Sequence, residues 1–204
     1  MGAYAASVYT GAMPDKVDKL IMIDLIKGIH VEPKNQPSRM AKYLEEVFDY
    51  EKKLFTKPPT YTYEEMVERM IKSYGGTLTE ESAKTLLIRG SEKQEDGRYS
   101  FNYDPVVKLN NIFSMSFEQQ KAFASQIKCE MLIIKASLGP LYENKTFYKE
   151  ILKIYDASSS KFLYKIVEGN HHVHLNDPTE CSSLINDFLE GKLEKSSEED
   201  ISQL

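Results

Sequence analysis

Residues 130–136 read EMLIIKA, a short run dominated by apolar side chains. Such a run is typical of a strand that is buried on both faces of a parallel sheet. Two further runs have the same character, KLIMID over residues 19–24 and FLYKIV over residues 162–167. Segments with helical patterns separate the three runs. Strands that alternate with helices predict an α/β fold with a parallel sheet.

The stretch between the first two strands has a different character. Residues 27–120 contain apolar positions at three- and four-residue spacing, and this pattern predicts amphipathic helices. The helices are expected at residues 38–55, 63–73, 77–89 and 116–126, with a tight turn at Asp96-Gly97. We therefore expect a helical lid, residues 27–120, inserted into a core formed by residues 1–26 and 121–191. The polar, acidic tail, residues 192–204, is expected to be flexible.

Composition and charge exclude several classes of function. The 204 residues carry 26 basic and 31 acidic side chains, a net charge of −5, so nucleic acid or an anionic membrane is not an expected partner. Cys129 and Cys181 lie far apart and form no metal-type pair, which favours a reduced, intracellular protein. No apolar run approaches the roughly 18–20 residues of a membrane-spanning helix. The N-terminus lacks the basic segment of a signal peptide.

Three of the four histidines cluster directly after the third predicted strand. His171, His172 and His174 lie in the segment GNHHVH, residues 169–174. Ligands of open parallel sheets bind beyond the carboxyl ends of the strands, so a histidine there can act as a general base. The alternative is a structural histidine whose ring is satisfied by the backbone. A zinc site made by His172, His174 and an acid is disfavoured, because no His/Cys pair has a recognised spacing.

Two carboxylates are candidates for the partner of a catalytic histidine. Asp24 ends the first predicted strand, where it could orient the histidine or cap the following turn. Glu143 follows the second strand, but Lys145 and Lys149 are close in sequence, and this pattern favours a surface carboxylate. The chain contains no Gly-x-Ser-x-Gly motif, the turn that carries the nucleophile in many serine hydrolases.

Five segments, in order, resemble serine hydrolase-like proteins of the kraken-like branch of the α/β-hydrolase superfamily. They are residues 1–9 (MGAYAASVY), 14–24 (PDKVDKLIMID), 87–90 (LIRG), 97–105 (GRYSFNYDP) and 169–174 (GNHHVH). The resemblance spans about residues 1–190. It implies the carboxyl-terminal part of an α/β-hydrolase fold with a helical lid, and it aligns Met1 and Gly2 with the last two positions of a Gly-His-Ser-x-Gly motif.

The same resemblance implies an activity and roles for individual residues. The activity is serine-dependent hydrolysis of a carboxylic ester or a similar small acyl substrate, without a metal or organic cofactor. His171 is the implied base. This chain has Leu141-Tyr142-Glu143 where relatives carry an aspartate, so the acid is Asp24 or Glu143, and Asp24 is favoured. The backbone amide of Met1 is the implied donor in the oxyanion hole.

The serine nucleophile of the family is absent from these 204 residues. Two interpretations are open: a truncated gene model of a complete hydrolase, which we favour, and a short binding or regulatory protein without catalysis. Under both, the chain alone is expected to be inactive. Strand 19–24 is expected to expose an open edge that favours self-association or a partner strand.

The last three residues, Ser202-Gln203-Leu204, resemble the Ser-Lys-Leu peroxisomal address, with Gln in place of Lys. A cytoplasmic protein is expected, with peroxisomal targeting as the alternative.

Overall fold

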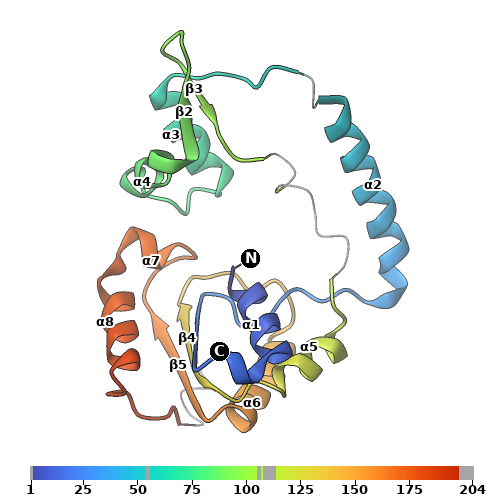
Figure 1. The fold of residues 1–204 in the computed structure, drawn as a ribbon, viewed down its shortest axis with the longest axis vertical. Coiled ribbons are helices and arrows are strands. Elements are labelled where there is room, and N and C mark those ends of the chain that lie inside the picture. Colours follow the sequence, from blue (N-terminus) through green and yellow to red (C-terminus); the bar gives the residue numbers. More distant parts are fainter. Residues whose placement is uncertain (1, 54–55, 105–106, 108–113, 198–204) are drawn as a thin grey trace. The chain divides into compact units, whose positions relative to one another are not determined.

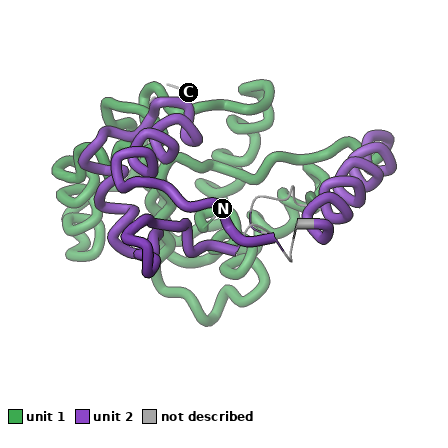
Figure 2. Tube along the Cα trace, turned by 90° about the horizontal axis from the view of Figure 1, so that it is seen from above, with its two compact units in different colours: residues 1–33, 114–204 green, residues 34–113 purple. Residues whose placement is uncertain are grey.

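A computed structural model describes residues 2–53, 56–104, 107 and 114–197 of the chain (Figure 1). These residues form two compact units (Figure 2). The first, here called the sheet unit, comprises residues 1–33 and 114–204, and the second, the inserted unit, comprises residues 34–113. Each unit is described by itself.

The sheet unit is built on three parallel strands, β1 (Lys19–Ile23), β4 (Glu130–Ala136) and β5 (Lys161–Val167), in the order β1-β4-β5. In the register of the sheet, Ile21 lies beside Leu132, and Leu132 lies beside Leu163. Six of the seven residues of β4 are buried. The predicted α/β fold with a parallel sheet is therefore confirmed, and its central strand is the one that the EMLIIKA run predicts.

Helices cover both faces of this sheet (Figure 1). Three of them, α1 (Gly2–Ala12), α5 (Phe117–Ala124) and α6 (Lys145–Ser158), pack on one face with Met131, Ile133 and Phe162. The short α7 (Val173–Asn176) and α8 (Pro178–Leu189) pack on the other face with Leu132, Ile134 and Leu163. Successive strand residues point to opposite faces, so β4 contributes to both apolar layers. The result is a three-layer α/β/α arrangement that places the carboxyl ends of the strands together.

In the residues that the structure describes, the inserted unit contains three helices and a small hairpin. Its elements are α2 (Gln36–Lys53), α3 (Tyr63–Ser73), α4 (Glu80–Gly90), β2 (Ser91–Lys93) and β3 (Tyr99–Phe101). Short 3-10 turns occur at Pro14–Lys16, in the sheet unit, and at Pro33–Asn35, at the boundary between the units. Strands β2 and β3 are antiparallel, which confirms the predicted turn at Asp96-Gly97. Met66, Val67, Ala83 and Leu87 form the buried cluster between α3 and α4.

The boundaries of the insertion differ from the predicted 27–120. They fall after residue 33 and after residue 113. Helix α5 belongs to the sheet unit because Phe117 and Ala124 pack into the apolar layer of the sheet. Periodicity in the sequence shows that a segment is helical, but it does not show against which core the helix packs.

The carboxyl-terminal segment is anchored where the sequence predicts a flexible tail. Ser196 is buried, and its hydroxyl accepts a hydrogen bond from the amide of Tyr164 and donates to the carbonyl of Tyr164. Its amide donates to the carbonyl of Phe162. Ser196 is therefore held against β5. The predicted targeting tail, Ser202-Gln203-Leu204, lies outside the described residues.

Within the described part of the chain, no helix combines the length and the apolar character needed to span a membrane.

Candidate active site

Asp24 and His171 meet at the carboxyl edge of the sheet. Asp24 directly follows β1, and its amide donates to the carbonyl of Ile134 at 2.7 Å, which holds the residue beside β4. Its backbone then turns through the left-handed region at φ 54°, an uncommon conformation for a residue other than glycine. His171 follows β5, and its Nδ1 lies 2.6 Å from Asp24 Oδ2. Two residues separated by 147 positions in sequence thus form one contact.

The two side chains of this contact differ in exposure. The side chain of Asp24 is completely buried, whereas that of His171 is 42% exposed. A buried carboxylate holds the ring, and the ring itself is open to solvent. Because Nδ1 faces the carboxylate, Nε2 is the ring nitrogen that can accept a proton from a second group.

Lys135 binds the other oxygen of the same carboxylate. Its Nζ lies 2.5 Å from Asp24 Oδ1, and the amide of Ala136 donates to the same oxygen at 3.1 Å. Lys135 Nζ also donates to the carbonyl of Ala136 at 3.0 Å, and its side chain is 5% exposed. Our sequence analysis did not identify this residue. The available signal is a lysine inside an apolar run, because a buried charge needs a partner.

Gly139 permits the close approach of these groups. A Cβ atom at this position would lie 2.0 Å from Asp24 Oδ1 and 2.3 Å from Lys135 Nζ. Both distances are far below van der Waals contact, so a side chain here would displace the ion pair. The turn is fixed by the amide of Gly139, which donates to the carbonyl of Ala136 at 2.9 Å.

Hydrogen bonds also fix the loop that carries the histidines. Asn170 Oδ1 accepts from the amide of His172 at 3.0 Å, and the carbonyl of Gly169 accepts from the amide of Leu138 at 2.8 Å. Burial lowers the pKa of His172 and of His174, and a positive charge on His171 would lower both further. Both rings are therefore neutral at pH 7. No group of three or more potential metal ligands occurs among the residues that the structure describes.

Comparison with known proteins finds relatives that are named as serine hydrolases or serine hydrolase-like proteins. No protein-family model matches the chain. It is 28% identical over 190 residues to a probable serine hydrolase of Drosophila melanogaster, covering 93% of this chain and 57% of the relative. It is 30% identical over 195 residues to a serine hydrolase-like protein of Danio rerio, covering 93% of this chain and 58% of the relative. The chain thus spans a little over half the length of these curated relatives.

Solved structures agree in fold. A hypothetical protein from Pseudomonas aeruginosa matches with a TM-score of 0.75 and 21% identity, over 94% of this chain and 63% of that one. A peroxisomal α/β-hydrolase of Saccharomyces cerevisiae matches with a TM-score of 0.60 and 13% identity, over 99% of this chain and 54% of that one. The chain therefore has an α/β-hydrolase fold. A thioesterase domain from the curacin biosynthetic pathway has the same fold, with a TM-score of 0.64 and 15% identity over 90% of this chain and 62% of that one.

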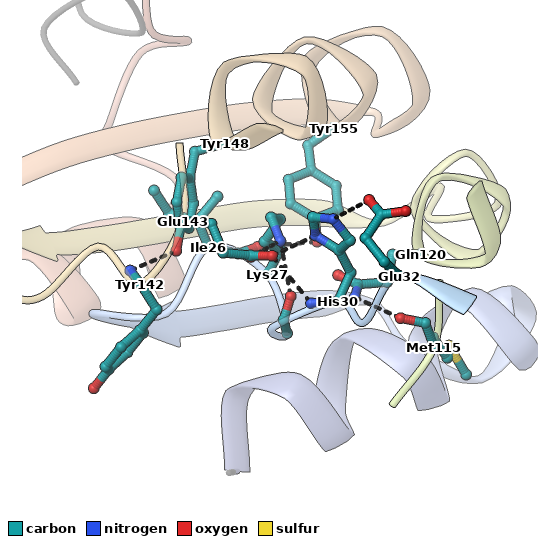
Figure 3. A network of polar contacts seen from close by, with 11 residues as sticks. Ile26, Lys27, His30, Glu32, Met115, Gln120, Tyr142, Glu143, Tyr148 and Tyr155 are labelled. Carbon is teal, nitrogen blue, oxygen red and sulfur yellow. Dashed lines mark hydrogen bonds and ion pairs between the residues drawn. The ribbon is translucent and has the colours of Figure 1, made fainter. Parts of the chain in front are cut away.

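Within the sheet unit, Glu143 lies in a second polar network, together with Lys27 and His30 (Figure 3). Its carboxylate forms a short ion pair with Lys27 Nζ through Oε2, and its Oε1 is in close contact with His30 Nδ1. The side chain of Glu143 is 11% exposed and that of Lys27 is 1% exposed, so the interpretation of Glu143 as a surface carboxylate is wrong. The carboxylate of Glu143, the alternative acid, thus contacts Lys27 and His30. The His171 ring contacts the carboxylate of Asp24 instead.

The contacts of the Glu143 network hold two segments of the sheet unit together. Burial lowers the pKa of Lys27, and the hydrogen bond and charge of Glu143 oppose this shift. The rings of Phe117 and Phe147 pack on His30, with centroids 5.5 and 4.5 Å away. The network ties the segment after β1 to the segment before α6. Sequence analysis gave neither Lys27 nor His30 a role.

The remaining predicted site residue, Met1, lies outside the described residues, so its role in an oxyanion hole stays a prediction. Helix α1, which follows it, begins at Gly2.

Proposed function

We propose that residues 1–204 carry the base and the acid of a serine-type hydrolase that acts on a carboxylic ester or a similar acyl substrate. The observation that supports this most directly is the contact between His171 Nδ1 and Asp24 Oδ2 at 2.6 Å, at the carboxyl ends of parallel strands. The names of the serine hydrolase-like relatives and the fold shared with a thioesterase domain support the same class of reaction.

In this proposal the two residues have the roles of base and orienting acid. His171 takes the proton of the serine hydroxyl at Nε2 and later donates it to the leaving group. Asp24 accepts from Nδ1–H, holds the ring in the tautomer that leaves Nε2 unprotonated, and stabilises the imidazolium as it forms. The burial of Asp24 and the exposure of His171 suit these roles, because the acid is protected from water and the base is open to a reactant.

The serine and the remaining strands of the sheet are, in this proposal, supplied by sequence beyond the 204 residues. The Gly-x-Ser-x-Gly motif does not occur in them, and the matched relatives are longer than this chain.

We therefore expect the isolated 204-residue chain to hydrolyse p-nitrophenyl esters at the background rate, because loss of the triad serine removes most of the catalysis. The measurement compares the chain with its His171→Ala variant and with buffer. Equal rates are expected in all three. Labelling of the chain by a fluorophosphonate probe, abolished by changing one of its serines, would contradict this expectation.

The proposal itself is tested on the endogenous protein, captured with an antibody against residues 192–204. A mass above 23.4 kDa, peptides reading Gly-x-Ser before Met1 and phosphonate labelling of that serine would support it. An intact endogenous protein of 23.4 kDa without labelling would overturn it.

A second candidate function is a non-catalytic binding or regulatory protein. The observation that favours it is the position of β1, which pairs with β4 alone among the strands described here. Its outer edge offers unpaired backbone groups, and such an edge favours pairing with another chain. A second copy of this chain or a partner strand would fill it.

This candidate predicts association of the 204-residue chain through β1. Sedimentation velocity is expected to give a weight-average mass that rises above 23.4 kDa with concentration. Hydrogen exchange at Lys19–Ile23 should slow in parallel, whereas exchange in the central strand β4 should stay the same. A monodisperse monomer with a cooperative thermal transition would exclude association.

A further inference from the structure

Lys135 is a buried cation near the carboxyl end of β4 in the sheet unit, and the roles proposed for Asp24 and His171 do not use it. Its ammonium group lies 2.5 Å from Asp24 Oδ1, while the other oxygen of that carboxylate lies 2.6 Å from His171 Nδ1. One carboxylate thus bridges a lysine and a histidine. Burying two charges costs several kcal/mol for each ion, so a purely structural role would be met as well by apolar residues.

We propose that Lys135 is a positioning residue that fixes the Asp24 carboxylate and keeps the His171 imidazole neutral, so that the ring is ready to accept a proton. This inference rests on the proposed role of His171 as the base. Lys135 acts through Asp24 and is not itself a catalytic residue.

The geometric part of the argument concerns the orientation of the carboxylate. Asp24 Oδ1 is fixed by two donors, the Lys135 ammonium and the amide of Ala136, at 2.5 and 3.1 Å. With Oδ1 held in this way, Oδ2 is left to receive Nδ1–H of His171. Without Lys135 the carboxylate would keep one backbone donor and could rotate, and the His171 ring would lose its fixed orientation.

The electrostatic part concerns the net charge of the three groups. With Lys135 and Asp24 both charged, a neutral His171 gives a net charge of zero, and a protonated His171 gives +1. If the lysine charge is removed, the same two states carry −1 and zero. A partly buried site favours the state of zero net charge, so Lys135 favours the neutral ring and its removal favours the imidazolium.

Other titratable groups near the site do not replace this effect. The rings of His171 and His172 are 4.9 Å apart, and burial lowers the pKa of His172 and of His174, so both stay neutral at pH 7. Burial and the charge of Asp24 raise the pKa of Tyr164, which is therefore also neutral. Glu168 is exposed and accepts a hydrogen bond from the Ser137 hydroxyl at 2.9 Å.

The test follows the ring resonances of His171 by NMR in the 204-residue chain, assigned by their loss in His171→Gln. In Lys135→Met the titration midpoint of His171 is expected to rise by about one pH unit, since a neighbouring charge typically shifts a titration by 1–3 units. Lys135→Gln keeps a hydrogen-bond donor without the charge, and the midpoint is expected to rise there as well. Unchanged midpoints in these two variants, when folded, would overturn the proposal.

Lys27→Met is the matched control. Lys27 is also a buried lysine of the sheet unit paired with a carboxylate, that of Glu143. This variant should be destabilised in the same way, yet it should leave the His171 midpoint unchanged. An equal shift in the control would show a general effect of losing a buried cation, and the proposal would fail.

A measurement on the unmodified chain does not depend on the folding of a variant. At pH 7.5 the ¹⁵N shifts of His171 are expected to be those of a neutral ring protonated at Nδ1, and imidazolium shifts would overturn the proposal. None of these measurements requires turnover. An inactive endogenous protein would therefore refute the proposed function and leave the coupling of Lys135 to His171 as a separate result.

Discussion

Asp24→Asn is expected to lower the free energy of unfolding of the 204-residue chain by about 3–5 kcal/mol, because it leaves the Lys135 ammonium buried without its counter-charge. The carboxylate of Asp24 and the side chain of Lys135 are 0% and 5% exposed, so water cannot replace the lost partner. Asparagine adopts the left-handed conformation at φ 54° at least as readily as aspartate, so the change tests the charge and not the backbone. Urea unfolding followed by circular dichroism measures the difference.

The control for this variant is Glu130→Gln, the same carboxylate-to-amide change at a partly exposed ion pair. Glu130 pairs with Lys19, and their side chains are 36% and 29% exposed. Exposed pairs contribute about 0–1 kcal/mol, so this variant should unfold nearly as the unmodified chain does. If both variants lost a similar amount of unfolding free energy, the buried Asp24–Lys135 pair would contribute no more to stability than the partly exposed Lys19–Glu130 pair.

The same Asp24→Asn substitution has a separate effect in the complete hydrolase of the proposed function. The side-chain amide of the introduced asparagine would present a donor to Nδ1, so His171 would carry its proton on Nε2, the nitrogen that has to accept one. A loss in kcat on the order of 10⁴ is expected for a triad with the wrong tautomer. A smaller loss, below tenfold, would assign the orienting role to a different acid.

The strands and the Asp24–His171 contact could be predicted from the sequence for one physical reason. Strands of a parallel sheet are buried on both faces, so they read as continuous apolar runs, and their carboxyl ends meet at one edge. A polar residue that follows such a run is therefore expected at this edge. Asp24 and His171 both follow such runs, and this position made them candidates for one site, with Glu143 as the alternative acid.

The contacts of Glu143 and Lys135 could not be predicted in this way. The nearby lysines favour a surface carboxylate at Glu143, but α6 begins at Lys145 with Asn144 as its N-cap, so Glu143 precedes the helix, and its carboxylate pairs with the buried Lys27. Lys135 lies 111 positions from Asp24, and their contact depends on β1 and β4 being neighbours in the sheet. No local pattern encodes that pairing. A charged residue in an apolar run indicates a buried ion pair without naming the partner.

Gly139→Ala is expected to lower the free energy of unfolding by about 3 kcal/mol, at the upper end of the range for overpacking in a core. The added Cβ would lie 2.0 Å from Asp24 Oδ1 and 2.3 Å from Lys135 Nζ. Neither group can move away at low cost, since each is buried and the carboxylate is also bonded to the amide of Ala136. The methyl group must therefore separate the ion pair or displace the turn, and urea unfolding measures the loss.

Gly90→Ala is the control, because a Cβ at Gly90 meets nothing within 4 Å. Gly90 is the last residue of α4, where alanine favours the helix, so this variant should be unchanged or more stable by up to about 1 kcal/mol. A Gly139→Ala protein as stable as the unmodified chain would mean that Asp24 and Lys135 are not held as closely as 2.5 Å. A destabilised Gly139→Ala protein in which the His171 midpoint also rises would link the close packing at Gly139 to the state of the base.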